Sequence, residues 1–435
     1  MNSATAEEQR KFGHAQRKNL RRRDHGALDA SARKTTAIAL VEKSMRGRVP
    51  ALIRLKRELM AASPFAYFRG AAPVMAADLS ALPNAGILCQ LCGDAHVRNL
   101  GAYAAPDGRL IFDINDFDET VQGPFEWDLK RMSASLVLAG RAAGNTDSAA
   151  QQAVAACVDA YCGLMCKFSE MPHTEVARFQ VHRLGAAKPV HAALLKAERA
   201  TPLHALMQLT EPVSKGKDSP RRFKQTPPML TRVTGKLRNE VLAALEPYRA
   251  MLEPQRQRLL TLYQPVDVAF KVVGTGSVGL RDYCVYFEGN GQRDPLFLQV
   301  KEEPDSAYAP YLRHARATHN GRRVAEGQRA MQMQSDPFLG WTKIGARQFL
   351  VRQLNDHKGS IEIEDLAGES LSAYAGVCGE LLARGHARSG DARVIAGYVG
   401  SGAAMASAIS RFAVAYADQT VKDWQELKRL VKVGR

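Results

Sequence analysis

Apolar and polar positions divide the chain into stretches of different texture. Between residue 51 and about residue 262, apolar residues recur at three- and four-residue spacing, which is typical of amphipathic helices. Residues 126–144 and 148–168 are the clearest cases. Two short apolar runs, GILCQL at 86–91 and GRLIF at 108–112, interrupt this pattern, and Gly, Asp or Asn bounds both. They predict two strands joined by a loop.

After residue 262 the pattern changes to short runs rich in Val, Phe and Tyr. Turn signals, GTGS and GNGQRDP, separate the first three of these runs, which favours strands. A helix is predicted over 311–334, and helices return from about residue 368. The strands are expected at residues 266–273, 280–289, 294–303, 338–345 and 347–354.

The fold class predicted from this order is α+β, with helical stretches before and after a sheet-rich one. The expected divisions are a basic arm at 1–45, a helical part at 46–262, a sheet-rich part at 263–365 and C-terminal helices at 366–435, which complete the helical part.

Composition narrows the class of protein. The 435 residues are 46% hydrophobic, enough for one large or two ordinary cores. No apolar run approaches the ~20 residues of a membrane helix, and the N-terminus lacks the apolar core of a secretory signal. The odd number of cysteines, seven, indicates reduced thiols in a cytoplasm. Zinc bound by Cys89, Cys92, Cys162 and Cys166 stays open, but small buried side chains are the favoured interpretation.

The net charge of +16 indicates anionic partners, and the basic residues cluster in residues 11–34 and 215–224. Nucleic acid is possible but not favoured, because few aromatic residues lie between the basic ones. A solvated or disordered tail is the favoured interpretation of the first cluster. The second cluster could recruit an anionic acceptor.

The first candidate site is CGDAHVRNLG at 92–101 with FDINDFDE at 112–119. Asn99 follows Asp94 by five residues, the spacing of a kinase catalytic loop, in which the Asp is the base and the Asn a metal ligand. A strand-like run then leads to Asp116-Phe117-Asp118, and Asp116 is the expected second ligand of Mg²⁺. The alternative is a polar hairpin whose Asp and Asn residues form turns.

The second candidate site is Gly274, Gly276 and Gly279, spaced GxGxxG. A strand-like run follows the third glycine, which favours the phosphate-covering loop of a kinase over a dinucleotide fingerprint. Lys301 on a later strand could reach the phosphates, and Glu326 on the next helix could pair with Lys301. Glu302 and Glu303 are rival partners, and an ordinary flexible hairpin is the alternative for the glycines.

Three further features stay undecided from the sequence. Asp128 could stabilise a helix N-terminus or brace the loop at Asp94. His96 could touch metal or substrate, although a structural role is commoner. The group His386, Arg388 and Asp391 could form a structural network or face the site.

These stretches together resemble an uncharacterised bacterial family, domain of unknown function 2252. The resemblance runs from about Arg46 to the C-terminal helices. The stretches that carry it are SPFAYFRGAAPVMAADL, CGDAHVRNLG, FDINDFDETVQGPFEWDLKRMSAS, GTGSVGLRDY, VKEE, VAEGQRAMQ, GHARSGD and FAVAYADQ.

The catalytic segments are also similar to those of the aminoglycoside phosphotransferase and choline kinase branch of the protein-kinase-like fold. This likeness implies a sheet-rich small lobe and a mainly helical large lobe, with Asp94 as base, Asn99 and Asp116 as metal ligands and Lys301 as the phosphate-binding lysine. Cys92 stands where many of those kinases have His, and Arg281 where the glycine-rich loop often has Val. Because the catalytic loop precedes the glycine-rich loop, a kinase-like fold would be circularly permuted.

The leading hypothesis is therefore an ATP- and Mg²⁺-dependent phosphotransferase with an unknown hydroxyl acceptor. A metal-dependent hydrolase using Asp94, His96, Asp113, Asp116 and Asp118 is a second. A non-catalytic nucleotide- or anion-binding pseudokinase is a third.

Overall fold

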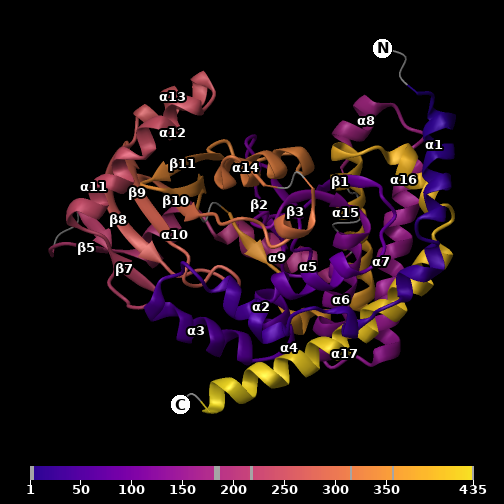
Figure 1. The fold of residues 1–435 in the computed structure, drawn as a ribbon. Coiled ribbons are helices and arrows are strands. Elements are labelled where there is room, and N and C mark those ends of the chain that lie inside the picture. Colours follow the sequence, from indigo (N-terminus) through magenta and orange to yellow (C-terminus); the bar gives the residue numbers. More distant parts are fainter. Residues whose placement is uncertain (1–3, 181–186, 216–218, 314–315, 355–356, 434–435) are drawn as a thin grey trace.

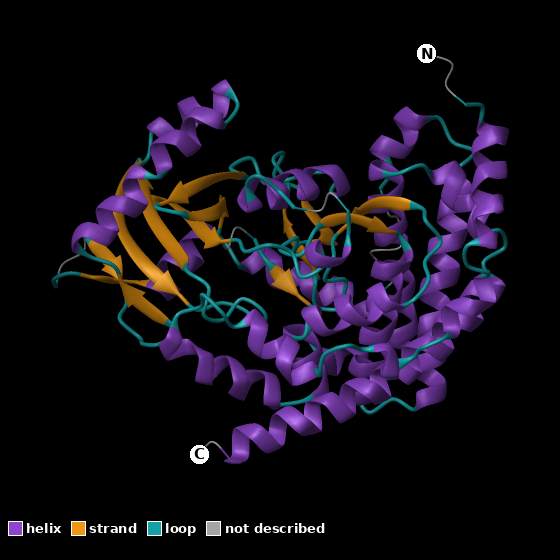
Figure 2. Ribbon diagram, in the orientation of Figure 1, coloured by secondary structure: helices purple, strands orange, loops and turns teal. Residues whose placement is uncertain are grey.

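The computed structural model describes residues 4–180, 187–215, 219–313, 316–354 and 357–433. It combines many helices with antiparallel strands (Figure 2), which confirms the α+β class. In Figure 1 a six-stranded sheet occupies one end of the molecule and long helices the other.

The sheet-rich end is one antiparallel sheet with the strand order β11-β12-β10-β9-β8-β7. All five strands expected after residue 262 are present, and β7 joins them from the preceding stretch. The bounds are β7 (Leu230–Arg232), β8 (Gln264–Lys271), β9 (Asp282–Gly289), β10 (Gly291–Glu302), β11 (Gly340–Ile344) and β12 (Arg347–Gln353).

Apolar clusters cover both faces of this sheet. On one face, Val285 and Leu298 pack with Tyr248 of α12, and the helices near that face are α11 (Gly235–Ala243), α12 (Leu245–Met251) and α13 (Pro254–Thr261). On the other face, Phe297 packs with Leu206 of α10 (Pro202–Leu209) and Phe223 of β6 (Arg221–Phe223). Strand β5 (Thr210–Pro212) pairs with β6.

The long helices form the largest core. These are α6 (Glu126–Ala142), α7 (Asp147–Phe168), α15 (Glu369–Ser389), α16 (Ala392–Val399) and α17 (Ala403–Val433). α7 and α15 approach closely: a Cβ added at Gly379 of α15 would lie only 2.0 Å from the carbonyl oxygen of Cys157 in α7. The C-terminal helices thus pack directly on α6 and α7.

Two small sheets lie between the long helices and the six-stranded sheet. β1 (Leu88–Leu91) pairs with β4 (Val121–Pro124), and β2 (Leu100–Ala104) lies between β13 (Gly359–Ser360) and β3 (Leu110–Ile114). Both strands expected here, β1 and β3, are present, but they belong to different sheets, and the segment between them contains a further strand in addition to loop. The added strand, β2, has the sequence LGAYA, whose small residues give little strand signal.

Helix α14 (Asn320–Met331) is shorter than the helix predicted over 311–334. The side chain of His319 accepts a hydrogen bond from the backbone N–H of Arg322 and so caps the helix at this point. A short 3₁₀ turn at Ala309–Tyr311 precedes it, and residues 314–315 of the predicted helix lie outside the described residues. The remaining short helices are α8 (His173–Arg178) and α9 (Lys188–Arg199).

The N-terminal residues are packed against the helical part, so the favoured interpretation of a solvated or disordered tail is wrong. Helix α1 (Ala6–Ala15) lies on α16, where a Cβ on Gly13 would be 1.9 Å from the carbonyl oxygen of Val394. Arg17 donates to the carbonyl oxygens of Gly397 and Tyr398. Backbone carbonyls at the end of α16 thus bind basic side chains that the sequence pattern assigned to solvent.

Four further helices lead from the N-terminal residues towards the small sheets. They are α2 (Ala37–Ser44), α3 (Pro50–Ala61), α4 (Pro64–Gly70) and α5 (Ala72–Ala81). Thr36 and Ser63 cap α2 and α4 through their hydroxyl groups. The local sequence therefore determines where both helices begin. In the part of the chain that the structure describes, no helix is long and apolar enough to cross a membrane.

Candidate functional site

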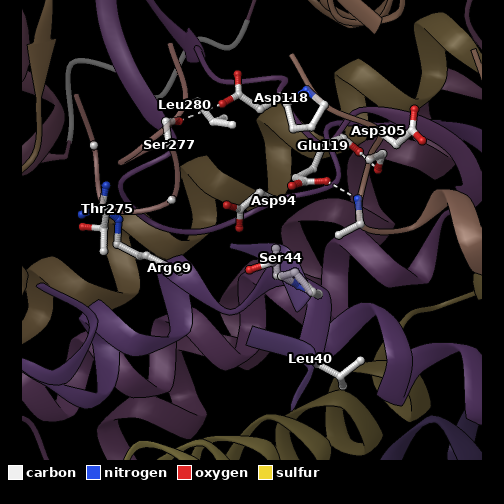
Figure 3. Close-up of a pocket in the computed structure, with 18 of the residues that line it drawn as sticks. Leu40, Ser44, Arg69, Asp94, Asp118, Glu119, Thr275, Ser277, Leu280 and Asp305 are labelled. Carbon is white, nitrogen blue, oxygen red and sulfur yellow. Dashed lines mark hydrogen bonds between the residues drawn. The ribbon is translucent and has the colours of Figure 1, made fainter. Parts of the chain in front are cut away.

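A cavity of about 470 Å³ lies where the small sheets, the N-terminal helices and the six-stranded sheet meet (Figure 3). Its walls include Asp94 and His96, then Asp116, Asp118 and Glu119. The turn between β8 and β9 supplies Gly274, Thr275, Gly276 and Ser277. Helices α2, α4 and α5 supply most of the rest of the lining, together with Arg46 and Arg48 between α2 and α3, Leu280, and residues in the range 304–311.

The loop at Asp94 is held by its backbone. The Asp128 carboxylate, in the first turn of α6, accepts hydrogen bonds from the N–H groups of Cys92 at 2.8 Å and Gly93 at 3.0 Å. Gly93 has a φ of +86°, and a Cβ there would lie 2.1 Å from the carbonyl oxygen of Glu119. Asp128 is therefore a brace for this loop as well as a helix N-terminal carboxylate.

His386 supports the same brace from behind. Its Nε2 lies 3.3 Å from Asp128 Oδ2 and its Nδ1 lies 2.9 Å from the hydroxyl of Tyr161. Arg388 donates to the carbonyl oxygen of Ala177, and Asp391 caps α16. The three side chains thus make separate structural contacts, and none of them lines the cavity.

Asp94 divides its two carboxylate oxygens between a structural contact and the cavity. Oδ1 accepts from Arg131 Nε at 2.6 Å, and the fully buried Arg131 lies over the ring of Phe68. Oδ2 is 3.8 Å from His96 Nε2, too far for a hydrogen bond. Burial lowers the pKa of His96 to about 3. The neutral imidazole leaves Asp94 Oδ2 free to accept a proton from a hydroxyl group.

Asn99 joins the two aspartates proposed from the sequence. Its Nδ2 donates to the carbonyl oxygens of Asp94 at 2.8 Å and Asp116 at 3.0 Å. Its Oδ1 is buried and has no hydrogen-bond partner among the described residues. A buried oxygen without a donor is costly, and a cation would satisfy it. Asn99 is thus a chemically suitable magnesium ligand, although it does not line the cavity itself.

Lys301 reaches this site from β10. Its Nζ forms an ion pair with Asp118, whose Oδ2 also accepts from the Ser277 hydroxyl at 3.2 Å. Burial acts to lower the pKa of Lys301, but the carboxylates of Asp118 and Asp116 outweigh it and raise the pKa above its ordinary value. The ammonium group is therefore charged where it meets the acids.

Asp116 and Asp118 differ strongly in their surroundings. Burial and then the Asp118 carboxylate raise the pKa of Asp116 to about 6. Burial acts on Asp118 in the same direction, but Lys301 outweighs it and holds the pKa of Asp118 below its ordinary range. Asp118 thus carries the ion pair, and Asp116 is the carboxylate that gains most from an added cation.

The expected pair between Lys301 and Glu326 is wrong. Glu326 is half-exposed on α14 and pairs with Arg322 at 2.7 Å. Glu303, one of the rivals, is buried beside Lys301, and neither of its carboxylate oxygens has a hydrogen-bond partner among the described residues. Burial, reinforced by Asp118, raises its pKa well above the ordinary value. Glu302 pairs with Arg281 and Arg347 instead.

Two basic side chains hold the glycine-rich turn in place: Lys56 of α3 and Arg48, which lies two residues before that helix. Lys56 donates to the carbonyl oxygens of Thr275 and Gly276, and Arg48 donates to that of Val278. Gly274 and Gly279 have φ values of +60° and +88°, which favour glycine. Gly274 and Gly276 line the cavity, whereas Gly279 packs against Arg48 behind it.

Sequence reasoning did not single out Lys56, Arg69 or Arg131. Arg69 lines the cavity beside Thr275 (Figure 3), and its Nε is buried without a hydrogen-bond partner among the described residues. Burial lowers its pKa. An arginine in the segment SPFAYFRG carries no local signal, because α4 points it into the cavity only through tertiary packing.

Asp113 is turned away from this group. It pairs with Arg384 of α15 on the buried side of β3. The cysteines are free thiols, and among the residues described no three His, Cys, Asp or Glu side chains are arranged to hold a metal. The zinc alternative therefore finds no support in the described part of the chain.

A smaller cavity of about 160 Å³ shares Asp116 with the first. Its other lining residues include Gln328 and Gln332 of α14, Asp336, Arg352 and Lys358. Burial lowers the pKa of Lys358 to about 7. The basic cluster at 215–224 contributes to neither cavity through its described residues: Arg221 and Lys224 donate to Thr210 and Met207, and residues 216–218 lie outside the described residues.

Comparison with known proteins identifies a family but no characterised relative. A search of curated proteins and a search of solved structures each found no match. One family model, described as an uncharacterized protein conserved in bacteria (DUF2252), matches residues 48–430. Because this match covers most of the chain, the chain belongs to the DUF2252 family.

Proposed function

We propose that this protein is an ATP- and Mg²⁺-dependent phosphotransferase that acts on a hydroxyl group. The observation that carries the proposal is the meeting of two distant segments at one cavity. Asp94, Asp116 and Asp118 line it from one segment, and the glycine-rich turn at 274–277 lines it from another about 180 residues later. Asn99 and Lys301 lie behind this lining: Asn99 donates to the carbonyl oxygens of Asp94 and Asp116, and Lys301 pairs with Asp118. A polar hairpin alone would not require this meeting.

The order of parts in the sheet-rich region supports a kinase-like fold. A glycine-rich turn joins β8 to β9, the third strand, β10, carries the lysine, and α14 follows before β11 and β12. Protein kinases arrange their glycine-rich loop, phosphate-binding lysine and following helix in this order. The base and metal-binding segments precede these strands, so the fold we propose is circularly permuted.

The reaction we propose gives each residue a defined task. Asp94 Oδ2 accepts the proton of the acceptor hydroxyl, whose oxygen bonds to the γ-phosphorus while the bond from that phosphorus to the β,γ-bridging oxygen breaks. The products are a phosphorylated acceptor and ADP. Asn99 Oδ1 and Asp116 would hold Mg²⁺, which neutralises charge on the phosphates. Residues 274–277 and Arg69 line the same cavity, so their backbone N–H groups and guanidinium would bind the phosphates.

One observation favours the anion-binding form of a second candidate, the non-catalytic nucleotide- or anion-binding protein. Lys301 is held by Asp118, and the sheet face beyond Lys301 is covered where Phe297 packs on Leu206. A nucleoside therefore has no access to that part of the sheet. The hydrolase alternative needs Asp113 in the metal-binding cluster, but Asp113 pairs with Arg384 instead.

Calorimetric titration with ATP, with and without Mg²⁺, tests the proposal. We expect the wild type to bind ATP more tightly with Mg²⁺, Asp116→Asn to lose that increment, and Lys301→Ala to weaken binding in both conditions. Phosphoryl transfer from γ-³²P-labelled ATP to a panel of hydroxyl compounds separates the enzyme from the non-catalytic alternative. Absence of ATP binding by the wild type would refute the phosphotransferase and the nucleotide-binding form of the alternative, and would leave the anion-binding form.

A further inference from the structure

The acidic and the basic side chains that line the larger cavity come from different segments of the chain. The acids come from residues 94–119 and from Asp305, and each accepts a hydrogen bond within the protein. The donors are Arg131 for Asp94, the Asp118 N–H for Asp116, Lys301 for Asp118, the Ala307 N–H for Glu119 and Asn320 for Asp305. Each acid of this wall thus has at least one donor within the protein, although Asp118 Oδ1 has none among the described residues.

The basic side chains of the cavity come from residues 43–69 and have no carboxylate partner. Lys43, Arg46 and Arg69 make no side-chain hydrogen bond or ion pair with any described residue, and Arg48 donates only to the carbonyl oxygens of Ser44 and Val278. A carboxylate does lie next to this segment: Glu42 precedes Lys43 in the sequence, but it pairs with Arg57. Arg48 and Arg69 are attracted by the acids across the cavity. Lys43 and Arg46 are exposed and present positive charge where they line the cavity, with no carboxylate among the described residues bound to either.

The four cations occupy two places relative to Asp94. Arg48 and Arg69 adjoin the glycine-rich turn: Arg48 bonds to Val278, and Arg69 lies beside Thr275 (Figure 3). Lys43 and Arg46 flank Ser44 at the end of α2. Figure 3 shows Ser44 across Asp94 from Asp118 and Ser277. The first pair therefore lies beside the turn that would bind the nucleotide phosphates, and the second lies at the end of α2.

We propose that the acceptor is a small hydroxylated molecule that carries its own anionic group, a phosphate or a carboxylate, bound between Lys43 and Arg46. This inference rests on the proposed function and names the substrate class of the same site. The anionic group pairs with the two cations at the end of α2 while a hydroxyl of the same molecule faces Asp94 Oδ2. Arginine and lysine are suited to such groups because each presents several charged donors.

The test uses inorganic phosphate as the probe of the anion site. The full chain is first saturated with Mg²⁺ and an ATP analogue whose γ-phosphate cannot be transferred, so that the nucleotide phosphate positions are filled. Phosphate is then titrated by calorimetry into the wild type, Lys43→Gln/Arg46→Gln and a charge-matched control, Lys236→Gln/Arg258→Gln. Both control residues are exposed and lie outside the cavity lining.

We expect phosphate to bind the wild type and the control alike, and to bind Lys43→Gln/Arg46→Gln about tenfold more weakly, as expected for two lost charge contacts. Absence of phosphate binding by the analogue-loaded wild type, or equal binding by both double variants, overturns the inference and leaves the proposed function standing. If the analogue itself does not bind, the proposed function fails. Phosphate is then titrated into the nucleotide-free wild type and both double variants. Weaker binding by Lys43→Gln/Arg46→Gln alone supports an anion site at these two residues, and equal binding by both variants overturns it.

Discussion

Lys301 of β10 and Asp118 form an ion pair that joins two segments 183 residues apart in sequence. The Lys301 side chain is 3% exposed and that of Asp118 20%. The pair therefore connects the six-stranded sheet to the loop that carries the acids, beside the cavity that Asp118 lines.

Lys301→Met is expected to lower the free energy of unfolding by about 3 kcal/mol, because it leaves Asp118 buried without its cation. Urea unfolding followed by circular dichroism measures this. The double variant Lys301→Met/Asp118→Leu is the control. Since it removes both charges, we expect it to be more stable than the single variant. A double variant as unstable as the single one would mean that the ion pair is not the cause.

Gly93→Ala is expected to destabilise the loop at Asp94 by more than about 2 kcal/mol. The left-handed φ alone costs an alanine about 1–2 kcal/mol, and the new Cβ would also meet the Glu119 carbonyl oxygen at 2.1 Å. Gly108→Ala is a matched control, because its φ is +82° but nothing lies within 4 Å of the new Cβ. Urea unfolding of both variants measures the difference. Equal losses would show that the contact with Glu119 has no weight.

The strands and the glycine-rich turn could be predicted because their signals are local. Alternating Val, Phe and Tyr and the glycines of GTGS define β8, β9 and the turn within about 25 residues. The proximity of Asp94, Asn99 and Asp116 followed from spacing in the same way. These features need no knowledge of how distant segments pack.

The partner of Lys301 could not be predicted from spacing. Glu326 has the expected place in the sequence, but α14 presents it to solvent beside Arg322, while Asp118 is brought to Lys301 by the packing of β10 on the loop after β3. The docking of α1 was missed for a related reason. It relies on Gly13 and on basic side chains that bind backbone carbonyls, and neither leaves a hydrophobic pattern.

The arm can be tested through Arg33, which forms bidentate contacts with Asp78 and Asp423. All three side chains are at most 8% exposed. Arg33→Met leaves two buried carboxylates without their cation, so we expect a loss of about 3–5 kcal/mol in unfolding free energy. Arg21→Met, which removes an exposed pair with Asp24, is expected to change it by about 0.5 kcal/mol or less. A solvated arm would instead give two small and similar changes.

Lys358 in the smaller cavity predicts a pH dependence of stability. Its pKa in the folded chain is about 7 because of burial and the nearby Arg352, below the ordinary lysine value of 10.5. Between pH 7 and pH 10 the unfolded chain therefore binds more protons at this residue than the folded chain. Stability contributed by Lys358 then rises with pH over this window.

The variant Lys358→Met removes this titration while keeping a side chain of similar length. We expect Lys358→Met to be more stable than the wild type at pH 7 and the advantage to shrink steadily towards pH 9.5, as measured by urea unfolding at each pH. Lys236→Met, at a residue whose side chain is 91% exposed, is the control and should show no such trend. A stability difference between Lys358→Met and the wild type that does not change with pH would mean that Lys358 keeps an ordinary pKa and that the smaller cavity is well hydrated.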